Sequence, residues 1–193
     1  MTQLATPPPA TVPRSRGMTV EQFLREPDQE NYELVDGQRV ERQTSYESAL
    51  IGGKFFRFFD EYADDHGGHA NAADADFRCF GDRKRNCRRP DATYIVPGRL
   101  DAPPKGPCEI PQDVAVEVIS PNDNASLLDD KRLLYLREGV RCVLIAHPVS
   151  RTVDVYYADR AEVLLDMDTL SLPEIMPEFE LPVAKVFPPK PAA

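Results

Sequence analysis

The chain has 193 residues, 41% of them hydrophobic, and a formal net charge of −9 at pH 7. This length allows one domain with a substantial core and is short for two. The acidic charge argues against a protein that coats nucleic acid through bulk electrostatics. No run of the sequence approaches the roughly 18 apolar residues of a membrane-spanning helix. We therefore expect one domain over residues 18–188 that works in the cytoplasm and away from membranes.

The ends of the chain and its cysteines limit the cellular setting. Residues 1–17 are rich in proline and threonine without the apolar stretch of a signal peptide, so a disordered tail is expected there. Residues 189–193 are expected to form a short C-terminal tail. The cysteines lie far apart, without a CxxC pair, at Cys79, Cys87, Cys108 and Cys142. This spacing favours reduced thiols and makes a structural zinc site the weaker alternative.

The first predicted elements are a short helix, a hairpin and a long helix. Thr19 and Gln22 have the spacing of a capping box and predict a helix start. Asp36-Gly37 between two strand-like runs predicts a tight hairpin turn. Over residues 46–65 the large apolar residues recur at helical spacing up to the sequence HGGH, which predicts a helix with one apolar face lying on a sheet.

The rest of the chain predicts a mixed sheet. A helix over residues 125–138 is expected to end before Gly139, a residue suited to a helix C-terminus, and the segment after residue 166 is expected to be irregular. The predicted strands are apolar or alternating and lie at residues 74–80, 92–96, 113–120, 141–148, 152–157 and 161–166. This order predicts an α/β (α+β) fold, a mixed β-sheet flanked by helices.

A glutamate lies inside the most apolar of these strands. Glu117 stands in the middle of DVAVEVIS, and a buried carboxylate needs a cation, hydrogen-bond donors or a raised pKa. Asp91 follows Pro90 at the start of the preceding strand, so pairing of the two strands would bring both carboxylates to one end of the sheet. The helix that leaves this end carries Lys131, with Tyr135 one turn later. Two carboxylates and a lysine are typical of a divalent-metal site.

Simpler structural interpretations stay open for each of these residues. Glu117 also fits a core carboxylate paired with an arginine, Lys131 a solvated helix residue and Tyr135 a core aromatic. His66 and His69 form an HxxH pair that falls short of a zinc ligand set and favours an exposed loop.

A basic run interrupts the acidic sequence just before Asp91. It is either a solvated loop between strands or a local patch that contacts phosphate. The candidate nucleic-acid-binding residues are Arg83, Lys84, Arg85, Arg88 and Arg89.

Six segments together resemble one known family. They are YELVDGQRVE, RRPDATYIV, DVAVEVISPND, DDKRLLYLREGVRCVLIAHP, TVDVYY and MPEFELPVAKVF. Their order and spacing resemble a restriction-endonuclease family, widespread in bacteria and especially in cyanobacteria, of the PD-(D/E)XK nuclease superfamily. The resemblance extends from about Thr19 to Phe187. It implies a restriction-endonuclease-like core: a helix, a three-stranded antiparallel meander, a second helix and a further strand.

The resemblance also implies the roles of the acidic residues and the lysine. Asp91 and Glu117 are expected to bind Mg²⁺ or Mn²⁺, with the carbonyl of Val118 as a further ligand. In the standard motif the lysine stands two residues after the acid, where this chain has Ile119. Some members of the superfamily carry the lysine on the next helix instead, so Lys131 is expected to take that role.

Other positions match the family less completely. Glu33 corresponds to an acidic position that such proteins often use as an auxiliary site residue, although it also fits a solvent-facing hairpin residue. Glu47 stands where many relatives carry a histidine, and His147-Pro148 replaces a common Asp-Pro turn. No role is assigned to Glu47 or His147.

These residues predict a hydrolase: a Mg²⁺-dependent endonuclease that cleaves phosphodiester bonds in DNA, with RNA left open as substrate, and that forms a homodimer. The alternative is a catalytically inactive nucleic-acid- or protein-binding module that retains the nuclease fold. The complete set of Asp91, Glu117 and Lys131 favours the enzyme, and the acidic net charge favours the binding module.

Overall fold

A computed structural model describes residues 17–121 and 123–189. The predicted tails at residues 1–17 and 189–193 lie outside these described residues, apart from Gly17 and Pro189. No helix in the described chain is both long and apolar enough to cross a membrane.

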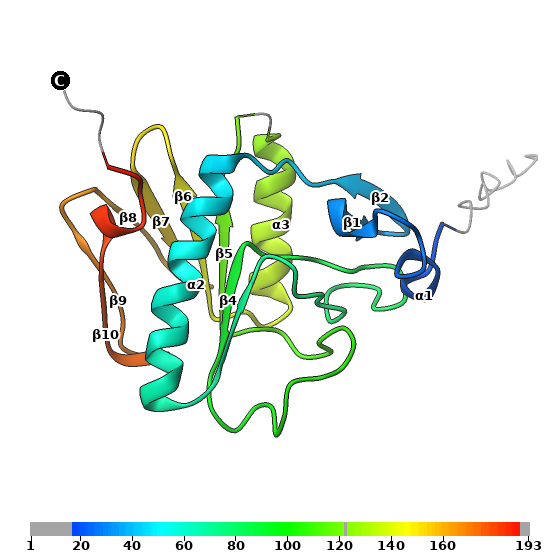
Figure 1. Cartoon of the computed structure of the whole chain (residues 1–193), viewed down its shortest axis with the longest axis horizontal. Helices are drawn as coiled ribbons and strands as arrows, with labels where there is room; N and C mark the ends of the chain where they lie inside the picture. The colour runs from blue at the N-terminus through cyan, green and yellow to red at the C-terminus, as the bar shows by residue number, and fades with distance from the viewer. Residues whose placement is uncertain (1–16, 122, 190–193) are drawn as a thin grey trace, which may run out of the picture.

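One mixed sheet forms the centre of the molecule (Figure 1). Over the described residues it has six strands in the order β3-β4-β5-β6-β7-β8, and every neighbouring pair is antiparallel except β5 and β6. The strands are β3 (His69–Ala72), β4 (Ala92–Ile95), β5 (Val114–Val118), β6 (Cys142–His147), β7 (Thr152–Tyr156) and β8 (Ala161–Leu164). A helix, an antiparallel β3-β4-β5 meander, a second helix and β6 follow one another, so the predicted fold class is confirmed.

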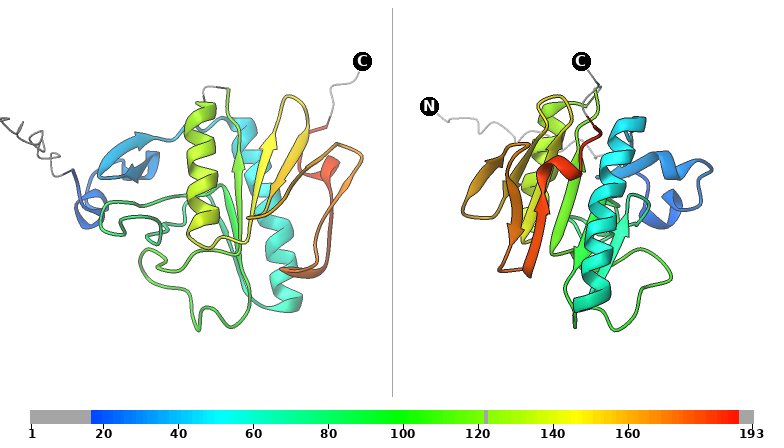
Figure 2. Two further views of the ribbon diagram at one scale, coloured as in Figure 1. Left: turned by 180° about the vertical axis from the view of Figure 1, so that it is seen from behind. Right: turned by 60° about the vertical axis from the view of Figure 1, so that its left-hand side comes forward.

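A helix covers each face of this sheet (Figure 2). One face carries α2 (Tyr46–His66) together with the hairpin of β9 (Thr169–Leu172) and β10 (Met176–Pro182), and the other carries α3 (Ala125–Arg137). Every residue of β5 is buried because both of its faces are covered. Side chains alternate along a strand, so Val116 packs on the α2 side and Ala115 on the α3 side. Glu117 therefore points towards α3.

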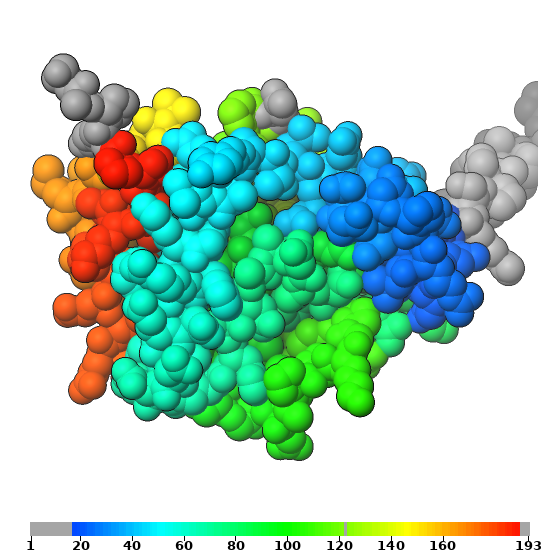
Figure 3. All heavy atoms as spheres, in the orientation of Figure 1, coloured from blue at the N-terminus to red at the C-terminus, as the bar shows by residue number. Residues whose placement is uncertain are grey.

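A small N-terminal unit lies beside the sheet and has its own apolar cluster of Val20, Phe23, Leu34 and Cys87. Thr19 and Gln22 form the predicted capping box, and Asp36 and Gly37 have positive φ angles of 49° and 83° in the predicted hairpin turn. Its elements are α1 (Val20–Phe23), η1 (Gln29–Asn31), β1 (Tyr32–Val35) and β2 (Gln38–Glu41), and a further turn, η2 (Val183–Lys185), lies near the C-terminus. The space-filling view shows this unit, in blue, on the same face as α2 (Figure 3).

Two predictions about the strands are wrong, one for residues 74–80 and one for the segment after residue 166. The predicted strand at residues 74–80 is mostly irregular, and within it only Phe77 makes bridges, to Arg88 and Cys108 in two separate loops. The ordered strand is β3, which begins earlier because Gly67 and Gly68, both at positive φ, turn the chain straight from α2 into the sheet.

The C-terminal segment is also more regular than predicted. It forms the β9-β10 hairpin, whose register shifts between Met176 and Glu180. Leu170 and Leu172 of β9 are buried in the core on the α2 side. The two prolines in MPEFELP argue against a strand inside a sheet, so β10 was not predicted. The strand can form because it lies at the edge of a two-stranded sheet, where proline is tolerated.

Candidate active site

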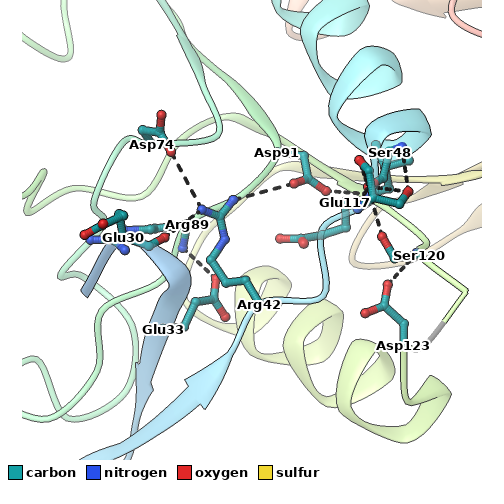
Figure 4. Close-up of polar contacts among 12 residues, drawn as sticks. Glu30, Glu33, Arg42, Ser48, Asp74, Arg89, Asp91, Glu117, Ser120 and Asp123 are labelled. Carbon is teal, nitrogen blue, oxygen red and sulfur yellow. Dashed lines mark hydrogen bonds and ion pairs between the residues drawn. The ribbon is translucent and has the colours of Figure 1, made fainter. Parts of the chain in front are cut away.

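The pairing of β4 with β5 brings the two predicted carboxylates together. Ala92 lies opposite Val116, and the amide N–H of Asp91 donates to the carbonyl of Val116 at 2.8 Å. Because the strands are antiparallel, Asp91, just before Ala92, and Glu117, just after Val116, come next at the same end of the two strands, and their side chains lie beside each other in Figure 4. The N–H of Val118 donates to Oδ2 of Asp91 at 2.7 Å, which ties the first carboxylate to the strand that carries the second.

Helix α3 supplies the groups that make a buried glutamate tolerable. Its seventh residue is Lys131, whose ammonium donates to Oε2 of Glu117 at 2.8 Å. One turn later the hydroxyl of Tyr135 donates to Oε1 of Glu117 at 3.1 Å. Glu117, 6% exposed, thus has a cation on one oxygen and a neutral donor on the other. Tyr135 is both a core residue and a site residue, a combination that its i+4 position after Lys131 suggested.

The β1-β2 hairpin adds a third carboxylate. Oε1 of Glu33 lies 2.9 Å from the ammonium of Lys131 and accepts the backbone N–H of Arg89 at 2.6 Å. The guanidinium of Arg88 lies 3.5 Å from Oε2 of Glu33. Glu33 is buried, so it is not a solvent-facing hairpin residue. The ammonium of Lys131 therefore contacts both Glu33 and Glu117.

Burial sets the charge state of these groups. It raises the pKa of Glu117 to about 8, with Lys131 opposing the rise and Asp91 and Glu33 adding to it. Burial also raises the pKa of Asp91. For Glu33 and Lys131 burial disfavours the charged forms, but their charged neighbours prevail: Lys131 and Arg88 lower the pKa of Glu33, and Glu117 and Glu33 raise the pKa of Lys131. At neutral pH the metal-free site therefore keeps Glu33 and Lys131 as ions and a proton on Glu117.

The start of α2 closes the site from the other side of the sheet. A Cβ built on Gly52 would lie 3.2 Å from the Cβ of Asp91, so the helix approaches the acid as closely as a glycine allows. The hydroxyl of Ser120 donates to that of Ser48 at 2.9 Å, and Asp123 accepts the N–H of Ser120 at 2.6 Å. Sequence reasoning missed these residues, and a glycine inside a helix was the one available signal.

The structure divides the predicted basic run. Arg83 and Lys84 are exposed, and Arg85 is half-buried and donates to the carbonyl of Asp36 at 2.6 Å. Arg88 and Arg89 are buried, and Nε of Arg89 donates to Asp76 at 2.6 Å. Arg83 and Lys84 are therefore the members of the predicted run that the structure exposes to solvent.

The contacts of the histidines are with residues other than Asp91 and Glu117. His66 stacks on Tyr62 with ring centroids 4.1 Å apart, and Nε2 of His147 lies 3.0 Å from Oδ2 of Asp154. His69 belongs to β3, and Glu47 is exposed near the start of α2. Across residues 17–121 and 123–189 no three His, Cys, Asp or Glu side chains are grouped as a ready-made metal site.

The residues present nevertheless fit one divalent ion. Mg²⁺ is commonly held by one or two carboxylates, with waters or substrate oxygens completing its coordination. Asp91 and Glu117 supply two carboxylates, and Val118, whose carbonyl is the expected further ligand, is tied to Asp91 through its N–H. Burial and like charge keep the proton on Glu117, and a bound cation would remove the reason for that proton. The donor set therefore suits a hard, oxygen-preferring ion and not zinc.

A three-stranded meander, a crossover helix and acidic residues at one sheet end define a restriction-endonuclease-like nuclease fold. The crystal structure of a "putative nuclease belonging to DUF820" from Anabaena variabilis has this fold, with a TM-score of 0.74 and 20% sequence identity over 88% of this chain and 97% of that chain. Residues 20–184 match the Uma2 family, described as "Putative restriction endonuclease". The chain belongs to this family. No curated protein matches it.

Proposed function

We propose that this protein is a Mg²⁺- or Mn²⁺-dependent endonuclease that hydrolyses phosphodiester bonds in DNA. The observation that carries the proposal is that the ammonium of Lys131 lies within 3 Å of both Glu117 and Glu33. This contact lies at the end of β5 that Asp91 also reaches. Family membership supports a nuclease. We further propose that residues 18–188 form one domain and that the enzyme acts in the cytoplasm as a homodimer.

In this proposal Asp91, Glu117 and the carbonyl of Val118 hold the ion. When bound, a divalent ion polarises the scissile phosphate and lowers the pKa of a water molecule. Lys131 has three N–H donors, of which Glu117 and Glu33 take two, and the third is left for the attacking water or a phosphate oxygen. Glu33 positions Lys131, because its carboxylate is itself held by Arg89.

Cleavage assays test this function directly. Supercoiled DNA, single-stranded DNA and RNA should be incubated with Mg²⁺, with Mn²⁺ and with chelator, using wild type and Asp91→Asn side by side. Metal-dependent cleavage of DNA that Asp91→Asn abolishes supports the proposal. Cleavage of RNA alone would change the substrate. Binding of nucleic acid without cleavage under any metal would favour the inactive binding module.

Metal binding should raise the thermal stability of the wild type. The ion binds the folded site and not the dispersed carboxylates of the unfolded chain. A free metal concentration 100 times the Kd therefore adds about 2.7 kcal/mol to the free energy of unfolding. For a chain of this size that corresponds to an increase in Tm of roughly 5–10 °C. Scanning calorimetry with millimolar Mn²⁺ or Mg²⁺ measures it. Asp91→Asn should show no such increase, and Asp64→Asn, a change at an exposed aspartate on α2, should show the full one. An unchanged wild-type Tm would argue against the metal site.

The exposed basic loop should contribute to nucleic-acid affinity. The bridge between Leu34 and Cys87 places this loop beside the N-terminal unit, on an otherwise acidic protein. Reversing Arg83 and Lys84 to glutamate should weaken DNA binding and reduce its dependence on salt by about two phosphate contacts.

The matched control for the basic loop is the reversal of Arg57 and Arg137, which changes the net charge equally at two exposed positions on α2 and α3. Fluorescence anisotropy across a salt series compares the two pairs. If both double variants change DNA affinity and its salt dependence equally, the loop is a solvated segment without a specific role in binding.

A further inference from the structure

Arg42 lies in the linker between β2 and α2, directly beside the carboxylate site. Its backbone N–H donates to the carbonyl of Asn31 at 2.9 Å, and Nη1 donates to the carbonyl of Glu30 at 3.3 Å. Only 13% of its side chain is exposed. The linker and η1 thus hold the guanidinium in place, so it has less conformational entropy to lose on binding a ligand than a free surface arginine has.

The hydrogen-bonding capacity of this guanidinium is largely unused. Nη2 lies 3.8 Å from Oδ1 of Asp91, and Nη1 lies 3.8 Å from Oδ1 of Asp74, both too long for hydrogen bonds (Figure 4). Within the described chain Nη2 makes no hydrogen bond. The side chain lines a cavity of about 300 Å³ together with Glu30, Asn31, Thr44 and Asp74. Arg42 therefore presents free donors to open space next to a proposed metal ligand.

We propose that Arg42 binds a phosphate group of the nucleic-acid substrate next to the metal site. This inference rests on the proposed nuclease function. A planar guanidinium matches two phosphate oxygens at once, which a lysine does not. Lys131 cannot serve this second phosphate, because Glu33 and Glu117 hold it on the α3 side. The carboxylate of Asp74 is 94% exposed, so it can turn into water when a phosphate takes its place.

The position of Arg42 gives its removal two effects of opposite sign. Its positive charge beside Asp91 repels a divalent ion and attracts a phosphate. Arg42→Met should therefore bind Mn²⁺ about fivefold more tightly, the effect of one unit charge a few ångströms away in a water-like dielectric. The same variant should raise the KM for DNA about 10-fold and reduce the salt dependence by about one phosphate contact. A merely structural loss would weaken both kinds of binding.

Arg39→Met is the matched control. Arg39 lies in the same hairpin, pairs with Glu26 and Asp28, and lies over the ring of Tyr32. The Arg39→Met substitution removes the same charge without changing a contact of the site, so the Mn²⁺ affinity and the KM for DNA should stay at wild-type values.

Two further variants separate charge from shape. Arg42→Lys should keep the salt dependence but not the full affinity, because an ammonium cannot bind two oxygens in the plane of a guanidinium. Asp74→Asn should lower the KM for DNA, since it removes the carboxylate that competes for Arg42.

Isothermal titration with Mn²⁺ and cleavage kinetics together decide the proposal. An Arg42→Met protein with wild-type KM and salt slope would overturn it, as would one that loses Mn²⁺ affinity and DNA affinity together. If the wild type cleaves no nucleic acid, the nuclease function fails on its own. Anisotropy of a labelled oligonucleotide in Mn²⁺ then decides for Arg42: a 10-fold weaker Arg42→Met supports the contact, and equal affinity refutes it.

Discussion

Replacing Glu117 by glutamine should abolish metal-dependent cleavage and yet stabilise the metal-free protein at pH 8. The amide oxygen can still accept the hydrogen bond of Lys131, and the amide NH2 can donate to the hydroxyl oxygen of Tyr135, but the side chain no longer carries a charge that burial opposes. Loss of a metal ligand should reduce cleavage by at least ~100-fold. The Tm increase caused by Mn²⁺ should disappear in the same variant, because a neutral amide is a poor ligand for a hard cation.

The pH dependence of stability follows from the same carboxylate. Because the pKa of Glu117 is raised to about 8 in the folded protein from an ordinary value of 4.5, the folded state binds the extra proton between these pH values. The free energy of unfolding of the metal-free wild type should therefore fall as pH rises through this window. The fall is at most about 1.4 kcal/mol for each pH unit. Glu117→Gln should not show this loss.

Urea unfolding at pH 5.5 and pH 8.5 measures both effects, with Glu33→Gln as the matched control of opposite sign. Its pKa is lowered because the charges of Lys131 and Arg88 outweigh burial, so its charge is stabilising and its neutralisation should destabilise the protein at both pH values. If Glu117→Gln were instead less stable than wild type at pH 8.5, Glu117 would be an ionised structural partner and the interpretation of its pKa would be wrong.

Replacing Lys131 by methionine should also abolish cleavage while the protein still binds metal. The ammonium contacts both Glu117 and Glu33, so its removal leaves Glu117 without a cation and Glu33 with Arg88 alone. Loss of one partner of a buried ion pair costs about 3–5 kcal/mol. Added Mn²⁺ should restore part of this stability, because the ion brings back positive charge at the same place. The increase in Tm with metal should therefore equal or exceed that of wild type.

The neighbouring residue provides the control for Lys131. Arg132→Met removes one charge from the same helix, but Arg132 pairs with Asp129 and lies over the ring of Tyr156, away from Glu117. This variant should cleave at the wild-type rate. Lys131→Arg should rescue cleavage poorly, because a guanidinium is not a compact point charge. A Lys131→Met enzyme with normal cleavage would refute the assignment of the catalytic lysine to α3.

Much of the fold was predictable because its signals are local. The capping box at Thr19, the Asp36-Gly37 turn and the buried run that becomes β5 each lie within a few residues of sequence. The strand expected at residues 74–80 failed because its bridges come from loops at Arg88 and Cys108, and pairing over that distance leaves no periodic pattern.

The sequence by itself determined the central site candidates. An acid in an apolar strand, Glu117, needs a cation or hydrogen-bond donors, and the helix after the strand places Lys131 where it can supply the cation. Strand pairing brings the second acid, Asp91, to the same end of the sheet. Their assigned roles remain predictions. Residue type and order carry this information because burial of a charge is costly in any fold that places the strand in the core.

Only the tertiary structure decided which of the other charged residues join the site. Glu33 lies in a hairpin that docks through its own apolar cluster, and Arg42 lies in the linker that follows this hairpin. The family resemblance suggested a site position for Glu33, but no feature of the local sequence distinguishes Arg42 from an ordinary surface residue. The same docking buries Arg88 and Arg89, which the sequence could not distinguish from the exposed Arg83. Contacts between segments that are far apart in the sequence depend on how those segments pack, and such long-range packing has no counterpart in the periodicity or spacing of either segment.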